Sequence, residues 1–582
     1  MDFSRPVAID TETTGTRPFQ GDKCTVVSFA DEHRAWAVPA SQALPILEQI
    51  VASSRPVIMH NSCFDRAVLS TSFGVEFPDH RIRDTQILAW LLREAHPHGL
   101  KEIGAKLFGA DAKAEQSALR ALMRGPSLDE LTTNLYSTGE YKTKKAAREA
   151  AVLDPRRVKR GWADLTFEEL EPYAIQDARL TFDVYRSLCQ EVRTTKPDVS
   201  PAIPREHKIA GIMYRLNKTG IRVNQQAAET ALLAAQQKSE ALRAQIPCEP
   251  DSPAQVSKWL YEDLGLPANR KTPKGAPSTD KIALEALRWH EDVARLLEYR
   301  QVTKAISAYL LPLLDRLGPD NRVHPSFNAH RIVTGRFSCS DPALQTIPRE
   351  GTNSEVRELF EPEPGMVFVG ADLPNGELRV LASMANEAVW LKAFRDGTDL
   401  HQVMADMMNV DRHTGKTCNF SLTYGAGAFK VAETLARGTG RPPNVNAARR
   451  LVARYWEAAP NVRRLMEDLG NRWAADGYLA FGDWVPGRYR HFMGPYGPES
   501  PHKALNSMIQ GGVAEMVKSW MIELEPELDR LGARLVLQVH DSLVIEADPA
   551  DAEKVGHLLQ LVLDDVNPYS GVAFPLDIKA GI

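Results

Sequence analysis

Residues 411–427, DRHTGKTCNFSLTYGAG, carry two cations and then two aromatic rings at a constant interval of four: Arg412, Lys416, Phe420 and Tyr424. Side chains four residues apart on an α-helix drift by about 40° per step, so the four would form one inclined stripe. Cations followed by aromatic faces suit a ligand with phosphates at one end and a stackable base at the other. The stripe favours a nucleoside triphosphate site, although a solvated, core-packed helix is the commoner origin of such a pattern alone.

Two aspartates are predicted on strands that flank this helix in the sequence. Asp372 ends the apolar strand MVFVGAD, and Asp541 lies at the centre of the predicted hairpin ARLVLQVHDSLVIEA. The step GKT at 415–417 looks like the end of a phosphate-binding loop, but that motif would need glycine where Val410 stands. We therefore reject an ATPase interpretation.

A second acidic group precedes residue 180. Its members fall into three motifs, D-x-E, N-x-x-x-D and Y-x-x-x-D, at Asp10, Glu12, Asn61, Asp65, Tyr173 and Asp177. The first pair projects to one side if its strand continues, and each later pair shares a helix face if helical. Adjacent carboxylates repel unless cations neutralise them, and such a set can hold two Mg²⁺ for phosphodiester hydrolysis. Any one pair alone would more often be a turn cap or helix surface, but the ordered set favours a metal site.

Composition and charge limit the alternatives. The 582 residues are 43% hydrophobic and 25% charged, which is typical of a soluble globular protein with at least two domains. The formal net charge of −5 means that local patches would have to hold any nucleic acid. The six cysteines stand singly, so we expect reduced thiols and no zinc site. Without a long uncharged apolar run or an apolar leader, we expect neither a membrane span nor secretion.

The chain is predicted to divide at a Pro-rich polar stretch. Residues 6–60 alternate β-rich runs with turns and helices follow, which predicts an α/β domain over 1–195. We place a linker at 196–206. The basic segment 142–160 interrupts the first domain, and a phosphate contact and a solvated face are equally weighted explanations for it.

Taken in order, the acidic motifs of residues 1–195 resemble the tyrosine subclass of the DEDD superfamily of 3′-to-5′ exonucleases. The resemblance implies a ribonuclease H-like fold and an active nuclease. Its metal ligands would be Asp10, Glu12, Asp65 and Asp177. Tyr173 would orient the attacking water.

From about residue 205 onward the chain resembles family A DNA polymerases, the family of bacterial DNA polymerase I and several phage replicases. Five motifs carry the resemblance in the family's order: TGRFSCSDPALQTIP (334–348), D-x-x-x-x-ELR (372–379), R-x-x-x-K-x-x-x-F-x-x-x-YG (412–425), ALNSMIQGGVAEM (504–516) and QVHDSLV (538–544). The implied fold class is multidomain α/β and α+β, with a right-hand polymerase after the exonuclease. Thumb and start of palm would span 207–335, and palm and fingers 336–582, with the fingers at about 390–475.

The same resemblance implies the functional residues. Asp372 and Asp541, with the Leu373 carbonyl, would hold two Mg²⁺, for which Mn²⁺ is a substitute. The residues that bind the incoming nucleotide would be Arg412, Lys416, Phe420, Tyr424, Glu377 and His401. Of these, Lys416 would also be catalytic, and Glu377 would exclude a ribose 2′-OH by crowding. DNA would be contacted by Arg336, Gln345, Asn506, Gln510 and His540 in the minor groove, and by Lys271, Lys274 and Arg300 on the thumb.

These motifs predict template-directed DNA synthesis from dNTPs with 3′-to-5′ proofreading, in a compact phage-type replicase because no 5′-nuclease domain precedes the exonuclease. The expected partners are primer-template DNA, dNTPs and a single-stranded DNA 3′ end. We expect a monomer in the cytoplasm, which is that of a bacterial host if the source is a phage. Its candidate replisome partners are a helicase, a primase and a single-strand binding protein.

One rival hypothesis is an exonuclease whose weakened polymerase half positions DNA. It is motivated by Ser542, where the family usually has Glu, and by Pro374 and Gly376 in DLPNGELR. The other is a DNA-binding scaffold without catalysis.

Overall fold

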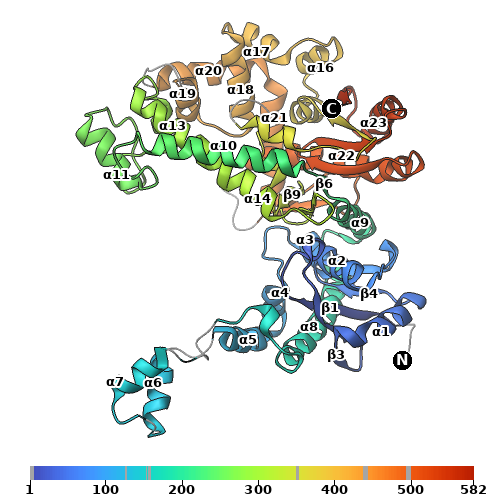
Figure 1. Ribbon diagram of the computed structural model, residues 1–582. Helices are drawn as coiled ribbons and strands as arrows, with labels where there is room; N and C mark the ends of the chain where they lie inside the picture. The colour runs from blue at the N-terminus through green and yellow to red at the C-terminus, as the bar shows by residue number, and fades with distance from the viewer. Residues whose placement is uncertain are drawn as a thin grey trace. The chain divides into compact units, whose positions relative to one another are not determined.

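The computed structural model describes residues 5–124, 128–139, 141–152, 154, 159–348, 353–436, 443–492 and 500–581. The chain forms two compact units (Figure 1). Unit 1 takes the residues up to Lys218 together with 329–331 and 485–489, and unit 2 takes the rest. Among the described residues, every helix is too short or too polar to pass through a lipid bilayer.

The boundary between the units lies later than the linker expected at 196–206. Helix α9 (Ile203–Thr219) belongs almost entirely to unit 1. Val199, Ala202 and Ala210 are buried in one hydrophobic cluster with Trp90 of the same unit. The Pro-rich composition marks a break in the helices, but the apolar side chains beside it still pack into the first core.

The core of unit 1 is a five-stranded sheet in the order β3-β2-β1-β4-β5. Its strands are β1 (Val7–Thr13), β2 (Cys24–Ala30), β3 (Ala35–Pro39), β4 (Val57–Met59) and β5 (Ile82–Asp84). Strand β1 pairs antiparallel with β2 and parallel with β4. This sheet confirms the α/β class predicted for the N-terminal domain.

Alternation along β1 assigns its side chains to opposite faces of the sheet. Val7 and Ile9 pack on one face with side chains of α1 (Ala40–Ala52) and α2 (Ser62–Phe73). Ala8 faces the other side, where it packs against Ala178 and Phe182 of α8 (Phe167–Thr194). Asp10 and Glu12 follow Ala8 by two and four residues, so their side chains emerge on the α8 face.

The remaining helices of unit 1 are mostly short. They are α3 (Thr85–Leu92), α4 (Leu100–Phe108), α5 (Ala114–Arg124), α6 (Leu128–Ser137) and α7 (Lys144–Val152). Part of the basic segment 142–160 lies outside the described residues. In the described part, Arg148 pairs with Asp129 at 3.1 Å and Arg160 pairs with Glu169 at 2.6 Å. Two of its cations therefore have acidic partners, and a phosphate contact by this segment stays a prediction.

Unit 2 contains a four-stranded sheet in the order β13-β14-β10-β15. Its antiparallel strands are β10 (Val367–Asp372), β13 (Arg534–Val539), β14 (Ser542–Ala547) and β15 (Asp577–Ala580). The long helix α22 (Pro501–Arg530) packs against β13, and α23 (Ala552–Val566) packs against β10 and β15. The predicted strand and hairpin are both confirmed. Asp541 lies in the hairpin turn and not in a strand, next to His540 with its positive φ of 57°.

Helical segments make up most of the remainder of unit 2. Those between residues 225 and 315 are α10 (Gln225–Arg243), α11 (Pro253–Lys258), α12 (Lys281–Glu285), α13 (Glu291–Lys304) and α14 (Leu311–Asp315). Those between 376 and 476 are α15 (Gly376–Ala385), α16 (Ala388–Arg395), α17 (Leu400–Met408), α18 (Arg412–Thr423), α19 (Ala428–Ala436), α20 (Val445–Ala458) and α21 (Pro460–Asp476). Short strands are β6 (Ile221–Arg222), β7 (Arg322–Val323), β8 (Ser326–Asn328), β9 (Ser338–Ser340), β11 (Tyr478–Ala480) and β12 (Tyr489–His491).

Candidate active sites

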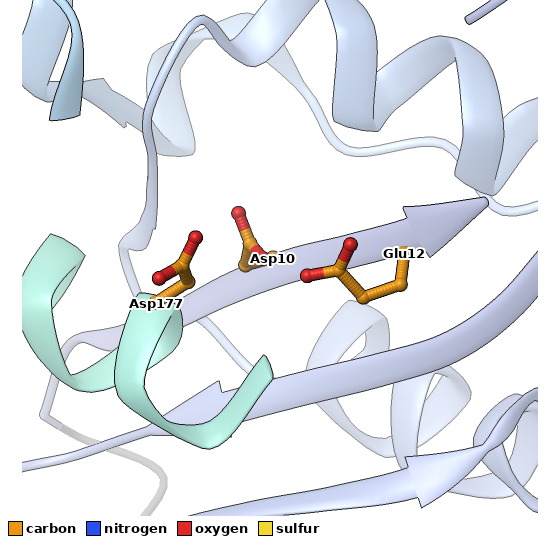
Figure 2. Close-up of side chains that lie close together, drawn as sticks. All are labelled: Asp10, Glu12 and Asp177. Atoms are coloured by element: carbon orange, nitrogen blue, oxygen red, sulfur yellow. The ribbon is translucent and has the colours of Figure 1, made fainter. Parts of the chain in front are cut away.

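Three carboxylates meet on the α8 face of the first sheet. Figure 2 shows Asp10 and Glu12 rising from the same strand, with Asp177 facing them from a helix. One oxygen of each carboxylate lies within 4.8 Å of the others. The small side chains of Ala8, Ala174 and Ala178 are fully buried between strand and helix. They let α8 approach the strand closely enough for the acids to meet.

Asp65 approaches this group from the first turn of α2. Its carboxylate accepts hydrogen bonds from the backbone N–H of Thr11 at 3.1 Å and from the Thr11 hydroxyl at 2.7 Å. Thr11 stands between Asp10 and Glu12, so β1 fixes Asp65 beside the other acids. The structure thus brings together Asp10, Glu12 and Asp177 of the predicted set. Asp65 lies near enough for the charge of Asp10 to act on it.

The four-residue spacing suggested that Asn61 and Asp65 share a helix face. They do not, because Asn61 lies before the helix. It precedes α2 in a left-handed conformation, with φ at 61°. The backbone N–H groups of Asn61 and Ser62 donate to the Asp84 carboxylate at 3.1 and 2.7 Å. Asp84 also accepts from the N–H of Gln86 at 2.8 Å and so caps α3. Sequence reasoning missed Asp84, although an aspartate between a strand and a helix is a recognisable N-cap pattern.

We expect Asp84→Ala to lower the unfolding free energy of unit 1 by about 2–4 kcal/mol, because three backbone N–H groups lose a buried acceptor. Degradation of DNA should weaken as well, since the same hydrogen bonds position the start of α2 and hence Asp65. Thermal unfolding measures the first effect. Asp31→Ala is a matched control, because Asp31 accepts two N–H groups at an exposed turn. Equal melting temperatures for the two variants would contradict the role of Asp84.

The buried carboxylates of this cluster carry more negative charge than the nearby cations neutralise. Desolvation raises the pKa of Asp10 to about 7. Desolvation and the neighbouring carboxylates raise the pKa values of Glu12 and Asp65 well above their usual range. A set of buried oxygen ligands in need of cations matches what Mg²⁺ and other hard divalent ions bind. The residues present therefore fit the metal that the sequence predicted here.

Tyr173 lies one helical turn before Asp177 on α8. Its ring packs near Trp162, with 5.9 Å between the ring centroids. Burial, together with the charges of Glu12 and Asp10, raises the pKa of the Tyr173 phenol above its usual value. The phenol therefore stays protonated at neutral pH and can donate a hydrogen bond toward the acidic group.

Lys101, on α4, is a second residue that sequence reasoning missed. Its ammonium is buried, forms an ion pair with Asp177 and lies 4.8 Å from the centroid of the Tyr173 ring. Desolvation lowers the pKa of Lys101 to about 8. A lysine on a short helix is normally solvent-exposed, so nothing in the local sequence distinguished this one.

The acidic pair of unit 2 is assembled by strand pairing. Ala371 of β10 lies opposite Leu543 of β14, which brings the end of β10 beside the turn that carries Asp541. The Ser542 hydroxyl donates a hydrogen bond to the Asp372 carboxylate. Burial, and then the charge of Asp372, raises the pKa of Asp541 to about 6. These two acids also fit a divalent cation, and the Leu373 backbone directly follows Asp372 in the sequence.

The unusual turn DLPNGELR has a steric explanation at Gly376. A Cβ at this position would lie 2.9 Å from Leu373 Cδ2 and 3.7 Å from an Asp541 oxygen. Asn375 takes the left-handed conformation, with φ at 57°, and α15 begins at the glycine. Glycine here therefore makes room for the Leu373 side chain, whereas a Cβ would be in ordinary van der Waals contact with Asp541.

Glu377 and Arg336 form an ion pair in unit 2. Burial raises the pKa of Glu377, and the Arg336 guanidinium opposes that shift. The sequence had assigned Glu377 to the nucleotide and Arg336 to the duplex. The ion pair therefore links a residue predicted to bind the nucleotide with one predicted to bind the duplex.

The helical stripe predicted from Arg412 to Tyr424 is confirmed for three of its four residues. Helix α18 begins at Arg412 and ends at Thr423, so Tyr424 is the residue that terminates it and no longer lies on it. Arg412 and Lys416 are exposed, whereas Phe420 is half-buried. A cavity of about 420 Å³ is lined by Arg412, Lys416, Phe420 and His401, together with Asn375, Arg379, Phe394, Gly397, Thr398, Asp399 and Leu400.

His401 and Gly415 show how this cavity is held. The His401 ring lies 5.4 Å from the Phe420 ring, and its Nδ1 is hydrogen-bonded to the Asn419 amide at 3.0 Å. Arg412 forms an ion pair with Asp399 on the opposite wall. A Cβ on Gly415 would lie 2.6 Å from the His401 carbonyl oxygen. Gly415 therefore allows α17 and α18 to pack closely. This packing role agrees with the rejection of a phosphate-binding loop at residues 415–417.

All five predicted minor-groove residues line a second cavity, of about 520 Å³. They are Arg336, Gln345, Asn506, Gln510 and His540. Sequence reasoning missed four further residues that line it: Trp473, Arg490, Phe492 and Lys503. Gln345 is oriented by a hydrogen bond from its amide to Gln538 at 2.8 Å. His540 directly precedes Asp541, and the charge of Arg336 acts on Asp541, so two of the lining residues lie near the acidic pair.

The three predicted thumb residues differ from one another. Lys271 and Lys274 are exposed on the turn-rich segment between α11 and α12. Arg300 is half-buried on α13 and donates to the Thr279 carbonyl at 2.5 Å. The lysines are available to a phosphate, whereas Arg300 supports the segment that carries them.

Comparison with known proteins follows the same division of the chain. Residues 2–193 match the family model described as 3′-5′ exonuclease, and residues 219–582 match the one described as DNA polymerase family A. A DNA polymerase of Mycobacterium phage L5 is 28% identical over 581 aligned positions that cover 95% of this chain and 89% of the relative. A thermostable DNA polymerase I of Thermus aquaticus is 33% identical over 402 aligned positions that cover 65% of this chain and 47% of the relative. The chain thus spans about half the length of such bacterial relatives.

A solved structure supports the fold. It is the POL domain of Pol1 from M. smegmatis in complex with DNA primer-template and dNTP, with a TM-score of 0.75 and 21% sequence identity over 99% of this chain and 94% of that one. At this identity the likeness concerns the fold alone. Because the polymerase model covers more than half of the residues, and the exonuclease model most of the others, the chain belongs to DNA polymerase family A and carries an N-terminal 3′-5′ exonuclease domain.

Proposed function

We propose that this chain adds dNTPs to a primer 3′-OH under the direction of a template and removes mispaired nucleotides by 3′-to-5′ hydrolysis. The observation that carries the proposal is the cavity of about 520 Å³, where residues from 336 to 540 converge beside the Asp372 and Asp541 pair. Minor-groove acceptors are similar for every base pair, so polar side chains there can check the shape of a duplex without reading its sequence.

In the polymerase site, the residues of α18 would bind the incoming nucleotide. Arg412 and Lys416 would hold its phosphates, and Lys416 would neutralise charge on the leaving pyrophosphate. Phe420 and His401 would contact the base and sugar, and Tyr424 would lie by the templating position. Asp372 and Asp541, with the Leu373 carbonyl, would hold Mg²⁺, which lowers the pKa of the primer hydroxyl and stabilises phosphoryl transfer.

In the exonuclease site, Asp10, Glu12, Asp65 and Asp177 would hold Mg²⁺ or Mn²⁺, which supplies an activated water and neutralises the leaving oxygen. Tyr173 would orient that water through its protonated phenol. A second site that removes errors adds discrimination beyond what one binding step gives, since a single contact is worth about 1–3 kcal/mol. Synthesis and trimming in one chain would therefore raise accuracy.

Glu377 would select deoxyribose by occupying the space of a ribose 2′-OH, held in place by Arg336. We expect Glu377→Ala to raise incorporation of CTP relative to dCTP by about 10- to 100-fold, the range that one steric contact supplies. Single-nucleotide primer extension measures the ratio. Glu361→Ala, which removes a carboxylate paired with Arg222 in the same unit, should leave the ratio unchanged. An unchanged ratio in Glu377→Ala would remove Glu377 from sugar selection.

A second candidate function is a 3′-to-5′ exonuclease whose polymerase half only positions DNA. Ser542 favours it, because a hydroxyl stands where the family usually has a carboxylate and engages Asp372 directly. Primer extension with Mg²⁺ separates the two functions, using dNTPs, NTPs or no nucleotide on a labelled primer. Extension with dNTPs supports the first proposal. Trimming without any extension would support the second.

For partners, we propose primer-template DNA, dNTPs and a single-stranded 3′ end in the exonuclease site. We propose a thumb and start of palm at 207–335, of which residues 207–218 and 329–331 lie in unit 1, and a palm with fingers at 336–582. We further propose a replicase that acts as a monomer in the cytoplasm, that of a bacterial host if the source is a phage, beside a helicase, a primase and a single-strand binding protein. The phage relative, aligned over 95% of this chain, supports the DNA polymerase part of this proposal.

A further inference from the structure

The acidic site of unit 1 contains a cation of its own. Lys101 has a relative exposure of only 6%, and its Nζ forms an ion pair with Oδ1 of Asp177. A lysine is almost never so fully buried unless its charge is paired. Asp177 is also one of the three carboxylates whose oxygens lie within 4.8 Å of one another. The ammonium therefore forms an ion pair with a carboxylate oxygen of the proposed metal site.

The charges around Lys101 show why a buried ammonium is stable there. Its positive charge acts on Asp10 and Glu12 as well as on Asp177. On its other side the ammonium lies over the Tyr173 ring, where the negative face of the ring attracts a cation. Buried carboxylates repel one another strongly unless cations compensate them. One ammonium cannot balance four acids, but it removes part of the repulsion.

We propose that Lys101 is a built-in counter-ion of this site, which holds Asp177 in the absence of a divalent ion and competes with that ion for the Asp177 carboxylate. The proposal rests on the metal site proposed above. It assigns to Lys101 two effects of opposite sign. Lys101 stabilises the metal-free fold of unit 1, and it weakens divalent-ion binding. A residue that merely oriented Asp177 would instead strengthen metal binding.

The test compares full-length wild type with Lys101→Met, Lys101→Arg and Arg81→Met. Methionine keeps much of the length of lysine without its charge, and arginine keeps the charge. Arg81 is a matched control, because it is a buried cation of the same unit that donates to the backbone carbonyls of Arg55, Val51 and Ile50. Binding of Mn²⁺ is followed by electron paramagnetic resonance of the free ion. Thermal unfolding is followed in EDTA and in saturating Mg²⁺.

We expect Lys101→Met to bind Mn²⁺ about tenfold more tightly, because the ion no longer competes with the ammonium for the Asp177 carboxylate and is no longer repelled by its charge. Its melting temperature should fall in EDTA and recover in Mg²⁺, because the ion replaces the lost charge. Lys101→Arg should stay close to wild type in both measurements. Arg81→Met should melt earlier to the same extent with and without Mg²⁺, and its Mn²⁺ affinity should be that of wild type.

Unchanged or weaker Mn²⁺ binding by Lys101→Met would overturn the proposal. So would a Lys101→Met protein that stays unfolded in saturating Mg²⁺, because the metal would then be unable to replace the ammonium. A variant with both Asp10→Asn and Glu12→Gln tests the underlying metal site separately. If wild type and this variant bind equal amounts of Mn²⁺, the metal site itself is wrong. If only the double variant loses a site while Lys101→Met matches wild type, the role of Lys101 alone is wrong.

Discussion

Asp372→Ala, or Asp541→Ala, is expected to reduce primer extension by about 10³- to 10⁵-fold and to leave degradation of single-stranded DNA within about twofold of wild type. The reason is geometric. The two carboxylates meet only because β10 pairs with β14, and either one alone offers too few oxygens to hold a divalent ion beside the primer end. The carboxylates that we propose for degradation of DNA lie in the other unit.

A labelled primer on a template measures both activities of these variants. Asp548→Ala is the matched control, since this exposed aspartate lies just after β14 and outside the acidic pair. It should extend the primer as wild type does. Loss of extension and degradation together, in a variant that melts at the wild-type temperature, would refute the assignment of synthesis to unit 2.

Replacing Asp10 and Glu12 together by alanine is expected to have the opposite effect. Degradation should fall by about 10³- to 10⁵-fold, because two of the three carboxylates that meet at the α8 face are removed. Extension of a matched primer should remain within about twofold of wild type. The error rate should rise, since mispaired ends are no longer removed before the next addition.

Release of labelled mononucleotide from single-stranded DNA measures the first effect, and extension of a matched primer the second. Glu32→Ala is the control, because Glu32 is an exposed acid of the same unit that pairs with Arg5. Degradation that persists in the double variant would show that hydrolysis occurs elsewhere. Extension that fails in it would show that the two activities share a site.

Local sequence patterns predicted most of the elements that carry the sites. The period of two along β1 puts Asp10 and Glu12 on one face, and the four-residue stripe from Arg412 gives one face of α18. The hairpin around Asp541 followed from alternating apolar residues and was confirmed. Such features depend on neighbours within a few residues, which is why composition and spacing suffice to find them.

Features set by distant parts of the chain were not predictable in this way. Asn61 lies outside α2 because Asp84, on another strand, accepts its N–H. Helix α9 packs into unit 1 through apolar contacts that the Pro-rich stretch concealed. Lys101 reaches Asp177 across 76 positions of sequence, and no local pattern marks such a pair. The convergence of five predicted duplex residues on one cavity likewise required the folded chain.

We propose that one chain builds DNA at one site and corrects it at another. The most direct test supplies dNTPs and Mg²⁺ to wild type on a labelled primer with a mispaired 3′ nucleotide and follows products with time. The account predicts a product shortened by one nucleotide before any longer product, and full extension afterwards. With Asp10 and Glu12 replaced, the shortened product should be absent. Extension directly from the mispaired end by wild type, or shortening that is never followed by extension, would contradict the account.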